Sequence, residues 1–103
     1  MAYRLIITEK AENDLDGIIG YIIEELCNET AAVHLLSEIE RHYDILETNP
    51  HIYPVCQQLL LSVRGYRKVV IKNYILIIRI DEDNRIVYAE RFFSQLEDYA
   101  DKL

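Results

Sequence analysis

Apolar residues recur with two different spacings along the chain, and these spacings predict the secondary structure. Residues 3–8 are rich in β-branched and aromatic side chains, which favour a strand. Over residues 9–26 the apolar positions follow the period of one helix face, and Thr8 is placed to cap the first turn. A polar break at residues 28–30 begins a second helix. We expect that helix to end at residues 49–50, Asn-Pro, because proline disfavours the helical conformation in the residue before it.

The second half of the chain has the shorter spacing of strands. Three apolar runs alternate with two short polar turns, the runs at residues 66–71, 74–80 and 86–93 and the turns at residues 72–73 and 81–85. Asn73 suits a two-residue hairpin turn, because asparagine tolerates the left-handed conformation. The three runs therefore predict an antiparallel meander.

Two further segments have weaker patterns. Residues 51–63 predict a packed loop, and residues 94–103 predict a short helix in which Ser94 and Glu97 have capping-box spacing. The order of elements is β, α, α, β, β, β and a short α. This order predicts an α+β fold, in which an antiparallel sheet of about four strands carries the N-terminal two-helix hairpin on one face. With 103 residues, 50% of them hydrophobic, we expect a single domain over residues 1–103.

Charge is unevenly distributed along this acidic chain. The formal net charge is −7, and residues 1–50 hold three basic and eleven acidic side chains, whereas residues 64–80 hold five basic side chains and no acidic one. An acidic surface repels nucleic acid, so only residues 64–80 offer a place for an anion or a docking edge for a partner. The acidic outer face of the helical hairpin serves either solubility or a contact with a protein, and the sequence leaves both open.

Gly17 and Gly20 lie within one turn of the first predicted helix. Each weakens a helix by about 1 kcal/mol relative to alanine. Two small residues this close together also mark places where another element crosses at short distance, and such a crossing is one explanation for them.

Cysteine and histidine form no recognisable cofactor or metal motif. Cys27 and Cys56 lie far apart and outside any CxxC spacing, so we expect two buried or half-buried thiols. His34, His42 and His51 include no pair at i, i+4, and we expect no metal site and no cofactor. The chain starts without a signal peptide and has no apolar run of about 18 residues, which predicts a cytoplasmic protein without a membrane segment.

Two stretches carry a resemblance to a known family. Residues 3–22 read YRLIITEKAENDLDGIIGYI, with an alanine, an Asp-Leu and a final Tyr-Ile at characteristic offsets. Residues 65–81 read GYRKVVIKNYILIIRID, in which Gly-Tyr-Arg, a hydrophobic strand, Asn-Tyr and a second strand ending in Arg-x-Asp follow one another. In this order the motifs resemble the RelE/ParE family, the toxins of type II toxin-antitoxin modules, over nearly the whole length.

The resemblance implies a function and its partners. RelE-like members are ribosome-dependent messenger RNA endonucleases, ParE-like members act on DNA gyrase, and a small antitoxin wraps and silences both. We predict the toxin of a plasmid-stabilisation type of module, with a ParE-like, gyrase-class target slightly favoured. A RelE-like endonuclease is the alternative, and a non-toxic binding module in a stable antitoxin complex is a further one. The predicted partners are an antitoxin and either gyrase or ribosome-bound messenger RNA, with no membrane, and self-association into a homo-oligomer is left open.

The resemblance also implies candidate site residues. If the chain is a nuclease, its catalytic candidates are Arg67, Arg91 and Tyr99. Its binding candidates, with or without nuclease activity, are Lys68, Arg79 and Arg64. The sequence departs from the nuclease pattern after the last strand, where many members place a histidine or tyrosine and a basic pair and this chain has Ser94, Leu96 and Glu97. Residues 75–78 also lack the arginine that RelE-like nucleases place there.

Each of these candidates also has a structural interpretation. Arg67, Arg79 and Arg91 share strand parity with apolar neighbours, so they form an electropositive stripe or pair with acidic residues such as Glu90, Glu97 and Asp98. Lys68 has the opposite parity from Arg67, which favours a solvated strand-edge charge. Tyr99 either acts as an acid or base or packs the C-terminal helix onto the sheet.

Overall fold

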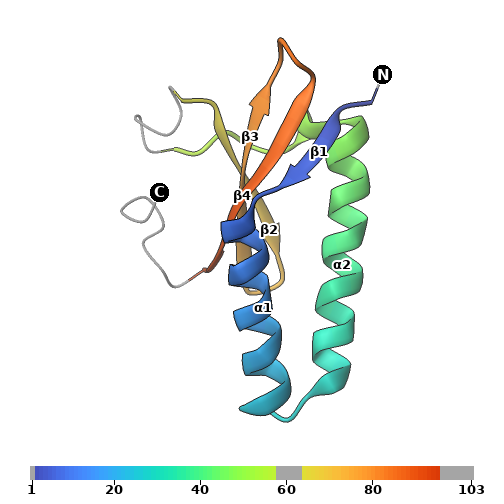
Figure 1. Ribbon diagram of the computed structural model, residues 1–103, viewed down its shortest axis with the longest axis vertical. Helices are drawn as coiled ribbons and strands as arrows, with labels where there is room; N and C mark the ends of the chain where they lie inside the picture. The colour runs from blue at the N-terminus through green and yellow to red at the C-terminus, as the bar shows by residue number, and fades with distance from the viewer. Residues whose placement is uncertain (1, 58–63, 96–103) are drawn as a thin grey trace.

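The computed structural model describes residues 2–57 and 64–95 (Figure 1). Its elements in chain order are β1 (Arg4–Ile7), α1 (Glu9–Glu24), α2 (Glu29–Thr48), the short 3₁₀ turn η1 (Pro50–Ile52), β2 (Tyr66–Ile71), β3 (Tyr74–Asp81) and β4 (Ile86–Ser94). The predicted strands and helices are confirmed to within about two residues at each end. The predicted C-terminal helix lies outside the described residues, apart from Ser94, which ends β4, and Gln95, which follows it.

The four strands form a mixed sheet in the order β1-β4-β3-β2. The meander β2-β3-β4 is antiparallel as predicted, but β1 pairs with β4 in parallel, so the expectation of a wholly antiparallel sheet is wrong in this detail. The reason is the connection between β1 and β2. Two antiparallel helices return the chain to the end where β1 started, and a three-strand meander then gives its third strand the direction of β1.

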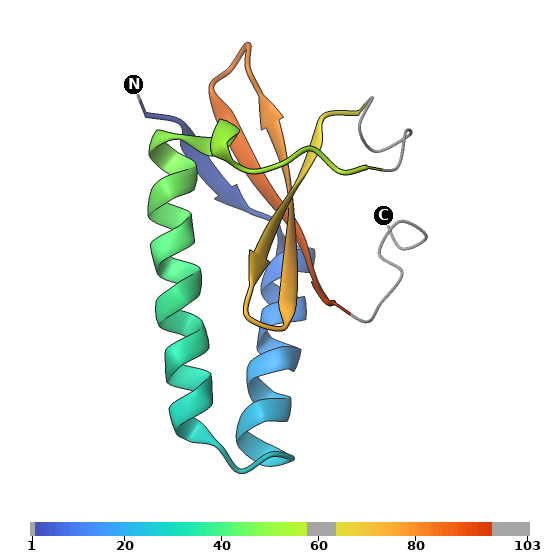
Figure 2. The same cartoon turned by 180° about the vertical axis from the view of Figure 1, so that it is seen from behind.

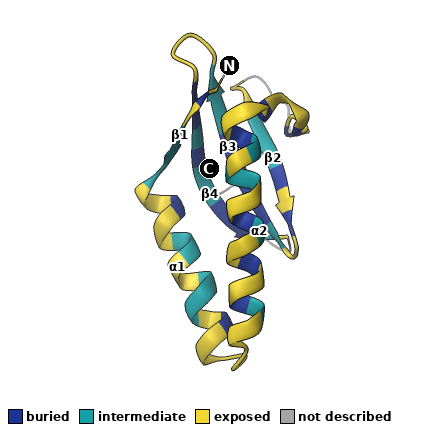
Figure 3. Cartoon of the chain, turned by 90° about the vertical axis from the view of Figure 1, so that its right-hand side faces the viewer, coloured by how far each residue is buried: buried dark blue, intermediate teal, exposed yellow. Residues whose placement is uncertain are grey.

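The helical hairpin covers one face of this sheet, which confirms the predicted α+β arrangement. α1 packs mainly beside β4, while α2 contacts β1 and β2 (Figures 1 and 3). The buried side chains of this core include Ala11, Ile22, Leu35, Ile39 and Leu46 from the helices and Val69, Ile71, Leu76, Ile78, Val87, Ala89 and Phe92 from the sheet. None of the helices in the described part of the chain is long and apolar enough to cross a membrane.

Side-chain caps fix where the helices begin. The Thr8 hydroxyl accepts a hydrogen bond from the Ala11 N–H at 3.1 Å and donates one to the Glu90 carbonyl at 2.8 Å. The same hydroxyl therefore caps the first turn of α1 and bonds it to β4. The Asn28 side chain accepts a hydrogen bond from the Ala31 N–H at 3.0 Å, which starts α2.

The predicted two-residue turn between β2 and β3 is present, with one difference. Of its two residues, Lys72 rather than Asn73 has the positive φ, at 53°. Gln95 closes over this turn, because its N–H donates to the Asn73 carbonyl at 3.0 Å and its side-chain amide donates to the Lys72 carbonyl at 2.6 Å. These two bonds hold the end of β4 against the hairpin.

The helical hairpin projects beyond the sheet, as both views along the shortest axis show (Figures 1 and 2). The strands do not reach the α1–α2 connection, so apolar side chains there lack the sheet as cover. We call the exposed set the hairpin tip, comprising Tyr21 (54% exposed), Ile23 (39%), Leu26 (55%), Val33 (59%) and Leu36 (37%). An exposed apolar cluster of this kind is typical of a contact surface.

The glycines of α1 do not mark a close crossing, and that expectation is wrong. A Cβ atom added at Gly17 or Gly20 would meet no heavy atom within 4 Å in the described structure. We therefore expect Gly17→Ala and Gly20→Ala each to raise the free energy of unfolding, by up to about 1 kcal/mol, because alanine has the higher helix propensity and nothing obstructs its methyl group. Chemical denaturation of the two variants and the parent chain measures this, and a loss of stability would show a constraint that the structure does not contain.

Candidate functional site

The sheet has a second face, turned away from the helical hairpin, that carries most of the predicted site residues. We call it the open face and define it by nine side chains, Tyr66, Lys68 and Val70 of β2, Ile75, Ile77 and Arg79 of β3, and Tyr88, Arg91 and Phe93 of β4. Ile75, Ile77 and Phe93 form a small buried cluster there with Cys56, separate from the main core. The open face therefore has an apolar floor with basic side chains among it.

Strand register determines which basic residues lie together. Lys68 is opposite Ile77, and Ile77 is opposite Arg91, so the two cations share a row across the sheet. Arg67 is opposite Ile78, a residue of the main core, and its strand neighbours Val69 and Ile71 are buried under the helices. The predicted stripe of Arg67, Arg79 and Arg91 is therefore wrong, and Lys68 takes the place of Arg67 on the open face.

Arg79 is held by two neighbours on the sheet. Its Nε atom lies 3.0 Å from a carboxylate oxygen of Glu90, and its guanidinium group stacks 4.4 Å from the centre of the Tyr88 ring. Glu90 reaches Arg79 because β4 has a register shift there: Arg91 pairs with Ile77 and Ala89 pairs with Ile78, which leaves Glu90 without an opposite residue. The alternative in which Arg79 pairs with Glu90 is thus the one that the structure contains.

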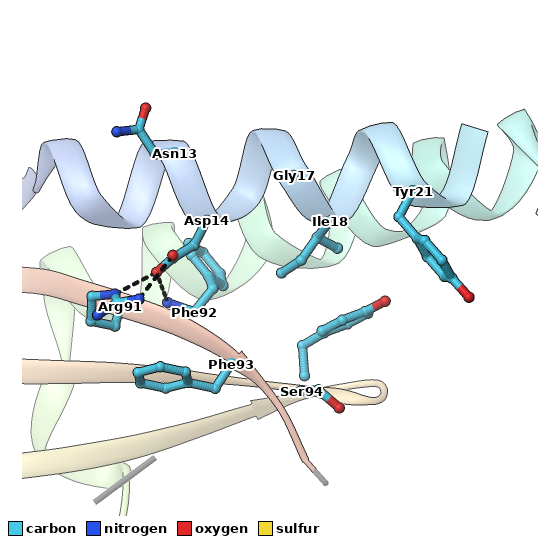
Figure 4. Close-up of a pocket in the computed structure, with 10 residues that line it drawn as sticks. Asn13, Asp14, Gly17, Ile18, Tyr21, Arg91, Phe92, Phe93 and Ser94 are labelled. Carbon is cyan, nitrogen blue, oxygen red and sulfur yellow. Dashed lines mark hydrogen bonds and ion pairs between the residues drawn. The ribbon is translucent and has the colours of Figure 1, made fainter. Parts of the chain in front are cut away.

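Arg91 is held by Asp14 of α1 (Figure 4). The two Asp14 carboxylate oxygens accept hydrogen bonds from Arg91 Nε at 2.7 Å and Nη2 at 3.1 Å. One of these oxygens also accepts the Phe92 N–H at 3.0 Å, and the Arg91 guanidinium group lies 4.8 Å from the centre of the Phe93 ring. β1 is shorter than β4, so Asp14 satisfies a main-chain donor on a stretch of β4 that β1 does not reach.

Arg67 binds the segment that follows α2. Its guanidinium group donates a hydrogen bond to the Tyr53 carbonyl at 2.7 Å. The same segment pairs with β2 through two main-chain bonds, from the Cys56 N–H to the Tyr66 carbonyl at 3.0 Å and from the Lys68 N–H to the Pro54 carbonyl at 2.9 Å. This part of the outer edge of β2 is therefore covered, and Arg67 is one of the groups that cover it.

The three remaining candidates are Lys68, Arg64 and Tyr99. Lys68 makes no ion pair within residues 2–57 and 64–95, and Arg64 is exposed in the turn before β2. Tyr99 lies outside the described residues, as do Leu96 and Glu97.

The two thiols differ in burial. Cys56 is buried beside the open face, where burial raises the pKa of its thiol and the nearby Lys68 charge opposes that change. Cys27 is exposed at the α1–α2 connection, so the expectation of a buried or half-buried thiol is wrong for it.

A groove of about 530 Å³ runs between α1 and the end of β4, with the Asp14–Arg91 pair inside it (Figure 4). Its walls comprise Asn13, Asp14, Gly17, Ile18 and Tyr21 of α1, Arg91, Phe92, Phe93 and Ser94 of β4, and Tyr74 of β3. Gly17 leaves this side of the helix without a side chain, which widens the groove.

Sequence reasoning missed Asp14 as a site residue, although a signal was present. Ala11, Asp14 and Ile18 are spaced i, i+3 and i+7, so Asp14 stands in the line of apolar residues that faces the sheet. A carboxylate in such a line requires a partner from the protein, and the basic residues of the last strand were the available ones.

Comparisons with known proteins identify the sequence family and the fold. The sequence model of a family described as the ParE toxin of the type II toxin-antitoxin system parDE matches residues 5–99. Among solved structures, the fold is similar to a chain of the chromosomal ParDE toxin-antitoxin system from P. aeruginosa, with a TM-score of 0.70 and 18% identity over 89% of this chain and 95% of that one. It is also similar to a chain of the toxin-antitoxin complex RelBE2 from Mycobacterium tuberculosis, with a TM-score of 0.63 and 22% identity over 91% of this chain and 99% of that one. No curated protein sequence gives a significant match.

Proposed function

Because the chain belongs to the ParE toxin family of type II toxin-antitoxin systems, we propose that it arrests growth by binding a protein target of the gyrase class and that a cognate antitoxin neutralises it. The observation that carries this proposal is that three of the candidate arginines already bind groups within the chain. Arg79 is bound to Glu90, Arg91 to Asp14 and Arg67 to the Tyr53 carbonyl. A nuclease needs such groups for the phosphate in the transition state, whereas a protein partner can use the exposed Val70 and the half-buried Tyr66 and Tyr88 of the open face.

The two alternatives keep specific support. Lys68 and Arg91 lie in one row of the open face. Two neighbouring basic residues are what a RelE-like endonuclease needs for a phosphate, so this placement supports that alternative. The exposed apolar hairpin tip is equally compatible with a non-toxic chain that persists in an antitoxin complex. In that case expression produces no growth phenotype, although the antitoxin still co-purifies with the chain.

Expression of the chain alone in bacteria separates these functions. We expect growth arrest while the pool of full-length messenger RNA stays intact, measured by sequencing transcript ends soon after induction. Co-expression of a cognate antitoxin should restore growth. Rapid ribosome-dependent cleavage of transcripts would reject the protein target, and unchanged growth with a stable antitoxin complex would support the binding module.

The hairpin tip is the surface that we assign to the antitoxin. It exposes Leu26 and Val33 next to the acidic residues Glu24, Glu25 and Glu29. A small pocket beside it, lined by Ile22, Leu26, Ala31, Leu35 and the β2–β3 turn, offers room for an apolar side chain. The surface therefore fits an amphipathic segment whose apolar face is flanked by basic residues.

A further inference from the structure

The acidic partners of the open-face arginines come from within the chain, and one of them comes from another layer of the fold. Arg91 and Phe92 of β4 both bind the Asp14 carboxylate of α1. Glu90 occupies the position of the β4 register shift and faces Arg79. Within the part of the chain that the structure describes, Arg79 is thus paired with Glu90 and Arg91 with Asp14.

We infer that Asp14 and Glu90 are specificity-determining residues that exclude nucleic acid from the open face. Lys68, Arg79 and Arg91 on their own form a triad of positive charges on one side of the sheet, with the half-buried aromatic side chains of Tyr66 and Tyr88 among them. Such a combination of cations and aromatic rings is what single-stranded RNA binds. With both carboxylates included, the summed charge of these five described side chains is +1 instead of +3, on a chain whose net charge is −7.

The geometry of the Asp14–Arg91 pair makes this exclusion effective. The Asp14–Arg91 contact has two hydrogen bonds, and the side chains of both residues are only a quarter exposed or less. A phosphate that approached Arg91 would have to displace a carboxylate that also satisfies the Phe92 N–H, which would leave a main-chain donor without its acceptor. The inference rests on the proposed function, in which the open face meets a protein rather than RNA.

The test removes the two negative charges and keeps the shapes. In the double variant Asp14→Asn, Glu90→Gln, the amide oxygen introduced at position 14 still accepts the Phe92 N–H, so the fold should persist. We expect the variant to bind a single-stranded oligoribonucleotide of about ten nucleotides that the parent chain binds only weakly. Removal of the two carboxylate charges should steepen the dependence of log affinity on log salt by about 1.4, so the affinity for RNA between about 50 and 200 mM salt should fall about sevenfold more than for the parent. Fluorescence anisotropy at several salt concentrations measures both quantities.

A matched control separates local from global charge. The double variant Asp16→Asn, Glu24→Gln makes the same two chemical changes at exposed positions of α1 and alters the net charge equally. It should leave RNA binding near the parent level. The inference is overturned if the two double variants bind RNA alike, or if the parent already binds as tightly as the Asp14→Asn, Glu90→Gln variant. Should that variant fail to fold, Glu90→Gln alone should give about half of the change in salt dependence. Transcript cleavage by the parent chain would instead reject the proposed function, so the two failures are distinguishable.

Discussion

Substitution of Leu76 by alanine is expected to lower the free energy of unfolding by about 2–5 kcal/mol, which is a large part of the total for a domain of this size. Leu76 lies in β3, one of the two inner strands of the sheet, and its side chain has no exposed surface. The core cluster to which it belongs contains residues of both helices and all four strands, so we expect that moving a single element cannot close the cavity left by the missing atoms. Denaturant titration followed by circular dichroism measures the loss.

The control for this prediction is the same chemical change at an exposed site. Leu26→Ala removes the same atoms from a side chain that is 55% exposed at the hairpin tip. We expect it to change the free energy of unfolding by less than about 1 kcal/mol, because most of the removed surface already faces solvent. Equal losses at the two sites would contradict the layered core described above.

The sequence predicts the elements well because their signals are local. Thr8 and Asn28 cap the two helices, the Asn49-Pro50 pair ends the second, and alternating apolar residues define the meander. The parallel pairing of β1 with β4 has no such local signal. It depends on where a helical hairpin returns the chain, which is a property of the whole topology.

The site was less predictable than the fold, and β2 shows why. Along this strand, residues of both parities are apolar or amphipathic, so periodicity alone cannot assign Arg67 or Lys68 to a face. Packing decides the matter, because Val69 and Ile71 are the residues that fill the core under the helices. On β4, Glu90 is an extra residue without an opposite partner, so Ala89 and Arg91 lie on opposite faces of the sheet. No pattern of apolar positions indicates this change of face.

Of the two carboxylates that pair with the arginines, one could be predicted from the sequence and the other could not. Glu90 was among the acidic residues expected to pair with the arginines, since a strand that carries Glu-Arg next to a partner strand with an arginine offers the contact directly. Asp14 was not, because it lies 77 positions from Arg91 in the sequence and comes from a helix. The helix pattern indicates that Asp14 needs a partner, but which arginine is that partner becomes visible only when the helix is placed on the sheet.

The second large effect is expected at the hairpin tip, in binding rather than in stability. We expect the double variant Leu26→Ala, Val33→Ala to weaken binding of the antitoxin by at least about 2 kcal/mol, or about 30-fold in Kd. Both side chains are more than half exposed in the free chain, so their burial by a partner should contribute mainly to the complex. Calorimetric titration of the purified chain with its antitoxin measures the change.

A second pair of exposed apolar residues provides the control. Ile52 and Val55 are 57% and 40% exposed but lie in the segment between α2 and β2, far along the chain from the tip. Ile52→Ala, Val55→Ala removes a similar apolar area and should leave the affinity for the antitoxin within about threefold of the parent. If both double variants bind the antitoxin equally well, the antitoxin does not use the hairpin tip. If the tip variant alone loses affinity while it still arrests growth, the surfaces for the antitoxin and for the target are separate, and the open face becomes the place where the target is sought.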